Sequence, residues 1–240
     1  MKPAKVVYIG KDLEAMDFAE NYHRWILELF APYLGKHFVE VGAGTGSFSK
    51  LLLEKKPESL CLIEPSDMYT QLVANIPVNG HRTRIDTYNS TFAEVRNKVA
   101  ETSPPDSIIY INVLEHIEDD QAELGMICET LAQGGKCVLF VPALQALYGN
   151  FDRKLGHFRR YRKAELESKC KAAGFQIIES TYFDLAGVIP WFVKYRLMGS
   201  EHLGGGAVEL YDRLVVPIFK RIEALVNVPI GKNILVIAQK

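Results

Sequence analysis

The chain has 240 residues, of which 48% are hydrophobic, so it can bury one substantial core and we expect a single domain. Its 28 lysines and arginines nearly balance its 29 aspartates and glutamates, which argues against a protein whose main partner is a nucleic-acid backbone. No stretch has the pattern of a secretory signal, and none is apolar and long enough to span a bilayer, so we expect no transmembrane segment.

The four cysteines show no CxxC spacing, and two of them lie inside apolar runs that read as strands. Free thiols of this kind are typical of a reducing compartment, so we expect a cytoplasmic protein. The residues are Cys61, Cys128, Cys137 and Cys170.

In chain order, the first predicted element is an amphipathic helix over residues 12–34, which we expect to lie across the carboxyl edge of a sheet. Downstream, short apolar runs alternate with helical patterns, as is typical of a mostly parallel sheet covered by helices. Residues 184–232 break this alternation, and we interpret them as an insertion before a final edge strand. The predicted strands are 37–41, 59–64, 82–86, 107–112, 135–141, 175–182 and 233–239.

The first predicted strand runs into a glycine-rich turn, VEVGAGTGSF at residues 39–48. Gly42, Gly44 and Gly46 permit positive φ, and without a Cβ they let a ligand lie against the backbone. A helical pattern follows at once, with Phe48 and Leu51 at helical spacing. The stretch therefore predicts a nucleotide-binding turn between a strand and a helix.

Two residues help to separate the classes of cofactor that use such a turn. Ser47 stands where the dinucleotide fingerprint GxGxxG has its last glycine. Glu40 places a carboxylate beside the turn, which opposes a pyrophosphate and suits a cation such as S-adenosylmethionine. Glu64, 22 positions after Gly42 (64 − 42), is positioned to accept hydrogen bonds from ribose hydroxyls, although a solvated carboxylate is the alternative interpretation.

Four segments together resemble the successive motifs of class I S-adenosylmethionine-dependent methyltransferases: VEVGAGTGSF, LCLIEP, SIIYINVLEHIEDD and LAQGGKCVLFVP. The resemblance implies an α/β, Rossmann-like, doubly wound, seven-stranded sheet with an antiparallel last strand. An N-terminal helix and a helical insertion before the last strand complete the expected fold. In these terms the single methyltransferase domain, residues 1–240, divides into an N-terminal helical lid (1–35), a cofactor-binding core (36–183), an insertion or substrate cap (184–232) and a final edge strand (233–240).

The resemblance also implies where S-adenosylmethionine binds. It places the methionine end near Glu40 and the glycines, the ribose on Glu64, the adenine near Met68, and the sulfonium near Asn112. The full set expected at the cofactor is Glu40, Gly42, Ala43, Gly44, Gly46, Glu64, Pro65, Met68, Ser90, Thr91, Asn112 and Val113.

The stretch LYGNFDRKLGHFRRYRKAEL (147–166) resembles the GHxRRY segment of one bacterial subgroup of these enzymes. His157, with an intrinsic pKa near neutrality, is our candidate general base, and we expect Tyr161 to be a second catalytic residue. Arg159 and Arg160 either hold an anionic acceptor or pair with acids and anchor the loop. His116 either acts in catalysis or holds its own loop by hydrogen bonds. The residues expected at the substrate are Tyr22, His116, Asp152, Arg159, Arg160 and Trp191.

The predicted reaction is methyl transfer by in-line attack to an oxygen or nitrogen of a small-molecule acceptor, anionic or apolar. We expect no metal site, because no histidine lies at ligand spacing to a cysteine or a second histidine. A non-catalytic cofactor-binding partner subunit and, less favoured, a dinucleotide-dependent oxidoreductase are the alternatives. The apolar insertion is open to three uses, as a roof over the acceptor, a contact with a membrane surface, or the interface of a homodimer rather than a monomer.

Overall fold

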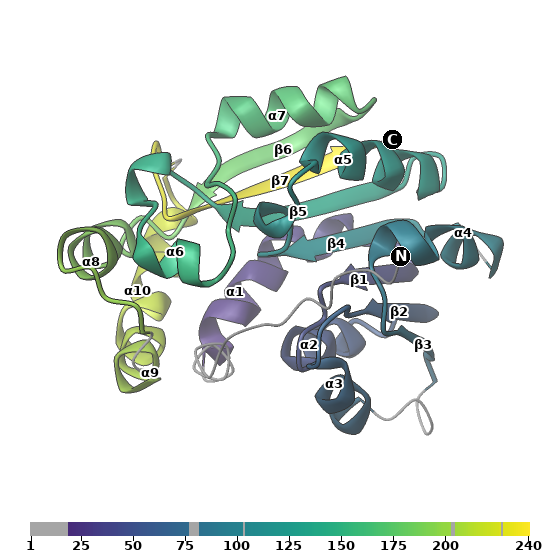
Figure 1. The fold of residues 1–240 in the computed structure, drawn as a ribbon, viewed down its shortest axis with the longest axis horizontal. Helices are drawn as coiled ribbons and strands as arrows, with labels where there is room; N and C mark the ends of the chain where they lie inside the picture. The colour runs from purple at the N-terminus through teal and green to yellow at the C-terminus, as the bar shows by residue number, and fades with distance from the viewer. Residues whose placement is uncertain (1–18, 77–81, 103, 203–204, 227) are drawn as a thin grey trace.

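The computed structural model describes residues 19–76, 82–102, 104–202, 205–226 and 228–240. A seven-stranded sheet with the order β3-β2-β1-β4-β5-β7-β6 runs through the middle of the molecule (Figure 1). The strands are β1 (His37–Val41), β2 (Ser59–Ile63), β3 (Arg84–Tyr88), β4 (Ser107–Ile111), β5 (Lys136–Pro142), β6 (Gln176–Phe183) and β7 (Asn233–Gln239).

Helices fill the connections between these strands. The α-helices are α1 (Glu20–Phe30), α2 (Ser47–Glu54), α3 (Tyr69–Asn75), α4 (Phe92–Thr102), α5 (Asp120–Thr130), α6 (Asn150–Lys154), α7 (Lys163–Ala172), α8 (Val188–Trp191), α9 (Gly205–Leu214) and α10 (Val216–Glu223). Shorter turns are the 3₁₀ segments η2 (Ala31–Tyr33), η3 (Leu114–His116) and η4 (Gln145–Leu147), and the π-helical segment η5 (Phe192–Leu197).

The sheet is parallel from β1 to β5, whereas β7 runs antiparallel to both of its neighbours. All seven strands lie within two residues of their predicted limits, and the predicted fold class is confirmed. The expectation that the last strand forms the edge is wrong: β7 inserts between β5 and β6, so that β6 is the edge. A strand buried on both faces and both sides fits the unbroken apolar run of ILVIA in β7, whose residues are fully buried.

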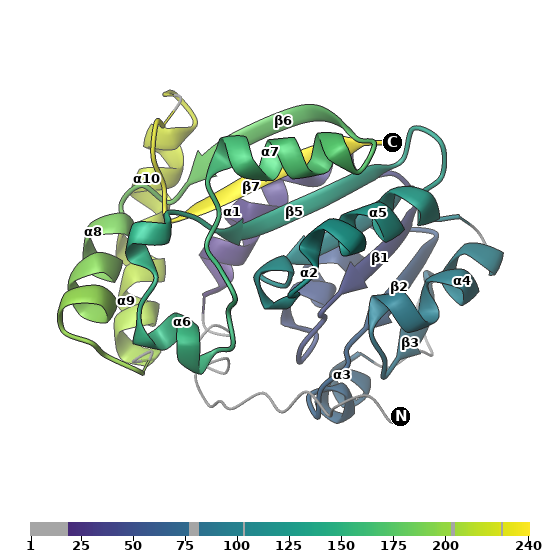
Figure 2. The same ribbon diagram turned by 45° about the horizontal axis from the view of Figure 1, so that its top comes forward.

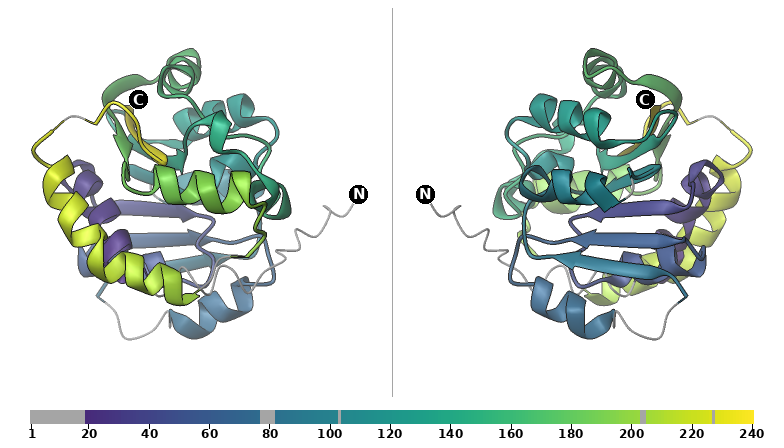
Figure 3. Two further views of the ribbon diagram at one scale, coloured as in Figure 1. Left: turned by 90° about the vertical axis from the view of Figure 1, so that its left-hand side faces the viewer. Right: turned by 90° about the vertical axis from the view of Figure 1, so that its right-hand side faces the viewer.

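Helices cover both faces of the sheet and enclose a separate core on each (Figures 1 and 3). One core joins α4, α5 and α7 to the sheet through residues such as Phe92, Ile127 and Leu166. The other joins α1, α2, α3 and the start of α10 to the opposite face, with Phe30, Leu52 and others at its centre. The result is a three-layer α/β/α domain.

We expected the first helix to lie across the carboxyl edge of the sheet, but α1 packs on one face of the sheet instead. The first residues of the predicted helix, 12–18, lie outside the described part of the chain. Trp25, Ile26 and Phe30 form a buried stripe that needs an apolar partner, and the sheet face supplies it. Only the first turn of α1 reaches the ligand pocket described below, through His23.

The insertion between β6 and β7 forms α8, η5, α9 and α10. These helices lie toward the end of the sheet to which the parallel strands point, near α6 (Figures 1 and 2). Asp212 of α9 ties the insertion to α1, because its carboxylate accepts hydrogen bonds from the backbone N–H groups of Asn21 and Tyr22 at 3.1 and 2.8 Å. Several large apolar side chains remain exposed here, among them Ile189, Leu197, Met198, Leu210 and Leu225. None of the helices in the described residues has the length and apolar character needed to cross a membrane.

Candidate functional site

A cavity of about 470 Å³ opens at the carboxyl ends of β1, β2 and β4. Strand order reverses here, because the chain leaves β1 toward β2 and β3 on one side and returns to β4 and β5 on the other. Helices diverge at such a switch point, and open α/β sheets bind their ligands there. The volume lies in the range of cavities that hold a small molecule or cofactor.

The glycine turn between β1 and α2 forms the floor of this pocket. Gly42, Gly44 and Gly46 all have positive φ, at 71°, 57° and 88°. A Cβ on Gly42 would lie 2.4 Å from Cγ2 of Val113, so the turn needs glycine both for its backbone and for its close approach to the loop after β4. Gly46 faces α3 instead, since its Cβ would meet Ile76 at 2.8 Å, and it is the one predicted cofactor residue that does not line the pocket.

The charge of the pocket distinguishes between ligands. Glu40, Glu64 and Glu123 line it, whereas no lysine or arginine does among the residues that the structure describes. His23 and His116 are the basic side chains at its surface. Three carboxyl groups without a permanent cation disfavour a pyrophosphate, and they favour a positively charged ligand, which draws them into their ionised form.

Two of these carboxyl groups are held in place by hydrogen bonds. Glu64 Oε2 accepts a hydrogen bond from Gly44 N at 2.8 Å, and its Oε1 accepts one from Ser66 N at 2.8 Å. Glu40 accepts a hydrogen bond from Ser49 Oγ, but burial dominates and, with the nearby Glu64 charge, raises its pKa to about 8. A cation beside Glu40 would restore the ionised form.

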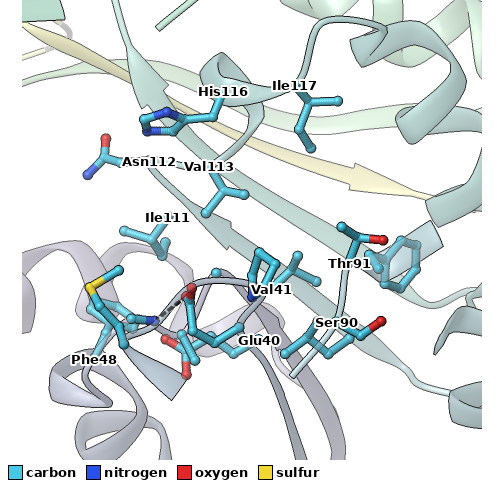
Figure 4. A pocket seen from close by; sticks show the side chains of 18 of the residues that line it. Glu40, Val41, Phe48, Ser90, Thr91, Ile111, Asn112, Val113, His116 and Ile117 are labelled. Atoms are coloured by element: carbon cyan, nitrogen blue, oxygen red, sulfur yellow. Dashed lines mark hydrogen bonds between the residues drawn. The ribbon is translucent and has the colours of Figure 1, made fainter. Parts of the chain in front are cut away.

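A second wall comes from the loop after β4, shown with Glu40 and Phe48 on the opposite side in Figure 4. Asn112 has a φ of 53°, a conformation that asparagine tolerates better than most residues, and with Val113 and His116 it faces the cavity. Ser90 and Thr91, after β3, lie on a third side. Burial and the proximity of His157 lower the pKa of His116 to about 3, while hydrogen bonds to the backbone of Leu155 and Gly156 oppose the shift.

Most of the residues predicted for the cofactor therefore line this pocket, whereas most of its apolar lining was not predicted. The residues predicted for the cofactor that line it are Glu40, Gly42, Ala43, Gly44, Glu64, Pro65, Met68, Ser90, Thr91, Asn112 and Val113. Those it missed are His23, Val41, Thr45, Ser47, Phe48, Ile63, Phe92, Ala93, Ile111, Ile117 and Glu123. The sequence gives little indication of these residues, because most of them are not motif residues themselves. They stand next to a motif residue at the end of a strand or the start of a helix.

Of the residues predicted for the substrate, only His116 lines this pocket. Arg159 pairs with Asp120 at 2.8 Å, and Arg160 pairs with Asp152 at 2.7 Å and is almost fully buried. This geometry matches the interpretation in which the arginines pair with acids and anchor their loop. Asp152 is itself fully buried at the centre of that anchor.

The remaining predicted residues also lie away from the pocket surface. Tyr161 is fully buried, and its hydroxyl donates to Asp120 Oδ2 at 2.9 Å. Burial, followed by the Asp120 charge, raises the pKa of Tyr161 well above its usual value, which is unsuited to proton transfer. Tyr22 is buried and donates to Asn233 Oδ1 at 3.1 Å, and Trp191 of the insertion packs against Phe151 of α6.

His157 lies behind His116, with ring centroids 4.6 Å apart and its own side chain only 8% exposed. One potential ligand atom from each of Glu115, His116 and His157 lies within 4.8 Å of the other two. Glu115 is fully buried, and burial raises its pKa to about 7, although the nearby His157 opposes the shift. The spacing rule behind the expectation of no metal site does not detect this cluster, because its members come from two separate loops.

Comparison with known proteins agrees with this geometry. The solved structure of a SAM-dependent methyltransferase from Archaeoglobus fulgidus is 16% identical, with a TM-score of 0.60 over 95% of this chain and 98% of that one. A possible histamine N-methyltransferase from Thermotoga maritima is 15% identical, with a TM-score of 0.56 over 95% and 93% of the two chains. A mycolic acid cyclopropane synthase complexed with SAH and CTAB is 14% identical, with a TM-score of 0.61 over 99% and 90%.

These identities are low and show a shared fold. No curated protein matches the chain significantly. Residues 14–180, however, match the family described as a methyltransferase domain. Because this match covers more than half of the chain, the protein belongs to that family and is a methyltransferase.

Proposed function

We propose that this methyltransferase transfers the methyl group of S-adenosylmethionine to an oxygen or nitrogen of a small-molecule acceptor. The observation that carries the choice of donor is the charge of the pocket, where Glu40, Glu64 and Glu123 meet no lysine or arginine among the described residues. S-adenosylmethionine brings a sulfonium and an ammonium, whereas a dinucleotide brings a pyrophosphate. The pocket is complementary to the first and repels the second.

In this proposal the methionine end lies by Glu40 and the glycine turn, the ribose by Glu64, and the reactive methyl near Asn112. The acceptor atom attacks the methyl carbon in line, the S–CH₃ bonding electrons pass to sulfur, and an O–H or N–H acceptor loses its proton. Transfer from a sulfonium needs no metal at the donor, so the pocket contributes mainly orientation and exclusion of water. The mostly apolar lining, including Phe48 and Ile111, supplies that dry environment.

His157 remains a proposed base, although its Nδ1 is engaged with Asp152 and its ring lies behind His116. A His157→Ala variant that keeps wild-type turnover would assign the residue to structure instead. The cytoplasmic location and a monomeric or homodimeric state also belong to the proposal; all four cysteines are free thiols, as a reducing compartment requires.

The test is an acceptor screen with methyl-labelled S-adenosylmethionine, scoring both transfer of the label and formation of the demethylated product. Small hydroxylated and amine compounds, anionic and apolar, make up the first panel. Labelled product supports the proposal. Binding of the donor without transfer to any acceptor, alone or with other proteins added, would favour the non-catalytic partner subunit.

A further inference from the structure

Glu115 is an unusual residue for the interior of this domain. Its side chain is fully buried, and neither carboxylate oxygen accepts a hydrogen bond from another residue that the structure describes. A buried carboxylate with no donor is rare, because removing it from water without compensation is costly. The surroundings must therefore offer it either a proton or a cation.

Two imidazoles lie beside this carboxylate. Nε2 of His157 is 4.0 Å from Glu115 Oε1, which is too long for a hydrogen bond, and His116 places a ring nitrogen within 4.8 Å of both. Three donors that each bind one ion at about 2.2 Å lie at most about 3.8 Å apart when they are evenly spaced around it. Side-chain movements of up to about 1 Å therefore bring all three ligand atoms onto one ion.

His157 is hydrogen-bonded to a carboxylate through the ring nitrogen that faces away from Glu115, as is typical of a histidine that binds a metal. Asp152 Oδ1 accepts a hydrogen bond from His157 Nδ1 at 3.0 Å, which fixes the tautomer and leaves Nε2 directed at Glu115. Arg160 Nε holds the same carboxylate oxygen at 2.7 Å. Histidines that bind metals commonly donate their other ring nitrogen to a carboxylate in this way.

The two loops that carry these ligands are fastened to each other before any ion binds. Phe158 N donates to Glu115 O at 2.9 Å, and Arg159 donates to Glu118 O at 2.7 Å. The Tyr161 hydroxyl, whose proton is shared with Asp120, also lies 3.3 Å from Leu114 O. Most of the ordering that a metal site requires has therefore been achieved by folding.

We propose that Glu115, His116 and His157 bind one divalent transition-metal ion at the wall of the methyl-donor pocket. Two imidazoles and one carboxylate are a ligand set of open Zn²⁺ and Fe²⁺ sites, which keep further positions for water or substrate. His116 also lines the pocket, so the ion lies beside the space that the acceptor enters.

An acceptor hydroxyl bound to this ion loses its proton to solvent more readily and then attacks the methyl carbon as the metal-bound oxygen. This consequence rests on the proposed function, whereas metal binding does not. It narrows the acceptor to a compound with an oxygen that can reach the ion. The three residues then act as ligands, and His157 is not the general base.

The experiment uses the full chain, treated with a chelator and titrated with Co²⁺ in the absence of S-adenosylmethionine. We expect one equivalent to bind, with the visible absorption of Co²⁺ in a low-symmetry nitrogen and oxygen site, and Zn²⁺ to displace it. Glu115→Gln and His157→Asn should each weaken binding by at least about a hundredfold. His37→Asn, which removes a histidine at the opposite end of the sheet, should leave it unchanged.

The proposal would be overturned if the wild-type protein showed no saturable binding of Co²⁺ or Zn²⁺. It would also be overturned if Glu115→Gln and His157→Asn bound Co²⁺ as tightly as the wild type does. If those variants do not fold, thermal unfolding of the wild type decides alone, because an ion bound only by the native state must raise Tm. A titration of the metal-free protein with S-adenosylmethionine separates the two proposals. Donor binding without Co²⁺ binding overturns only the metal site, and the reverse overturns only the choice of donor.

Discussion

The protonation of Glu40 should make donor binding depend on pH. Burial holds the pKa of this carboxyl at about 8 in the free protein, so at pH 7 only roughly one molecule in ten has it ionised. A bound cation favours the ionised form and lowers that pKa. Affinity for S-adenosylmethionine should therefore rise about tenfold per pH unit from pH 6 to pH 8 and then level off, with release of up to one proton on binding.

Isothermal titration at pH 6, 7, 8 and 9, in two buffers of different ionisation enthalpy, measures both the slope and the protons released. Glu40→Gln should weaken binding at pH 8 and remove most of the slope. Glu123→Gln is the matched control: Glu123 lines the same pocket and burial also raises its pKa, but the proposal does not place the donor's cationic end on it, so the slope should remain. A flat profile for the wild type, or proton uptake on binding, would refute the assignment of Glu40 to the cationic end of the donor.

Three further results are expected. Glu64→Ala should weaken S-adenosylmethionine binding roughly ten- to hundredfold, because a charged acceptor of hydrogen bonds is lost; unchanged affinity in titration means that the ribose lies elsewhere. Gly42→Ala should lower the free energy of unfolding by about 1–3 kcal/mol more than Gly44→Ala, since only the first meets Val113 while both strain a positive φ; equal denaturant midpoints would contradict this. Ligand-free Glu40→Gln should be more stable than the wild type, by a margin that grows as pH rises from about 4.5 to 8, because the folded wild type keeps a proton on Glu40 that the unfolded chain has released; thermal unfolding across that range checks the sign.

The strands and the pocket proposed for the donor were predictable because their sequence patterns are local. A strand such as β1 is an apolar run, and the turn that follows it is set by glycines whose positive φ few other residues adopt. Once parallel strands are assumed, Glu40, Glu64 and Asn112 must meet at one edge of the sheet, since each stands at or next to the carboxyl end of its strand. The local pattern thus predicted most of the residues that line the pocket at this edge.

The other half of the site was not predictable in the same way. His116 and His157 are 41 positions apart (157 − 116), and only the pairing of their two loops brings the rings together. From the sequence, Arg160 was equally suited to bind an anionic acceptor and to anchor its loop through an ion pair. Only tertiary packing determines that it pairs with Asp152. The central place of β7 was not predictable from local pattern either, because the long insertion lets the chain return between β5 and β6.

The most direct test of the central claim is isothermal titration of the purified chain with S-adenosylmethionine, its demethylated product and NADH at pH 8. The acidic pocket predicts micromolar binding of the first two and none of NADH. Tight binding of NADH without S-adenosylmethionine would show that the turn at residues 42–46 accepts a pyrophosphate, and the assignments of Glu40, Glu64 and Asn112 would all be contradicted.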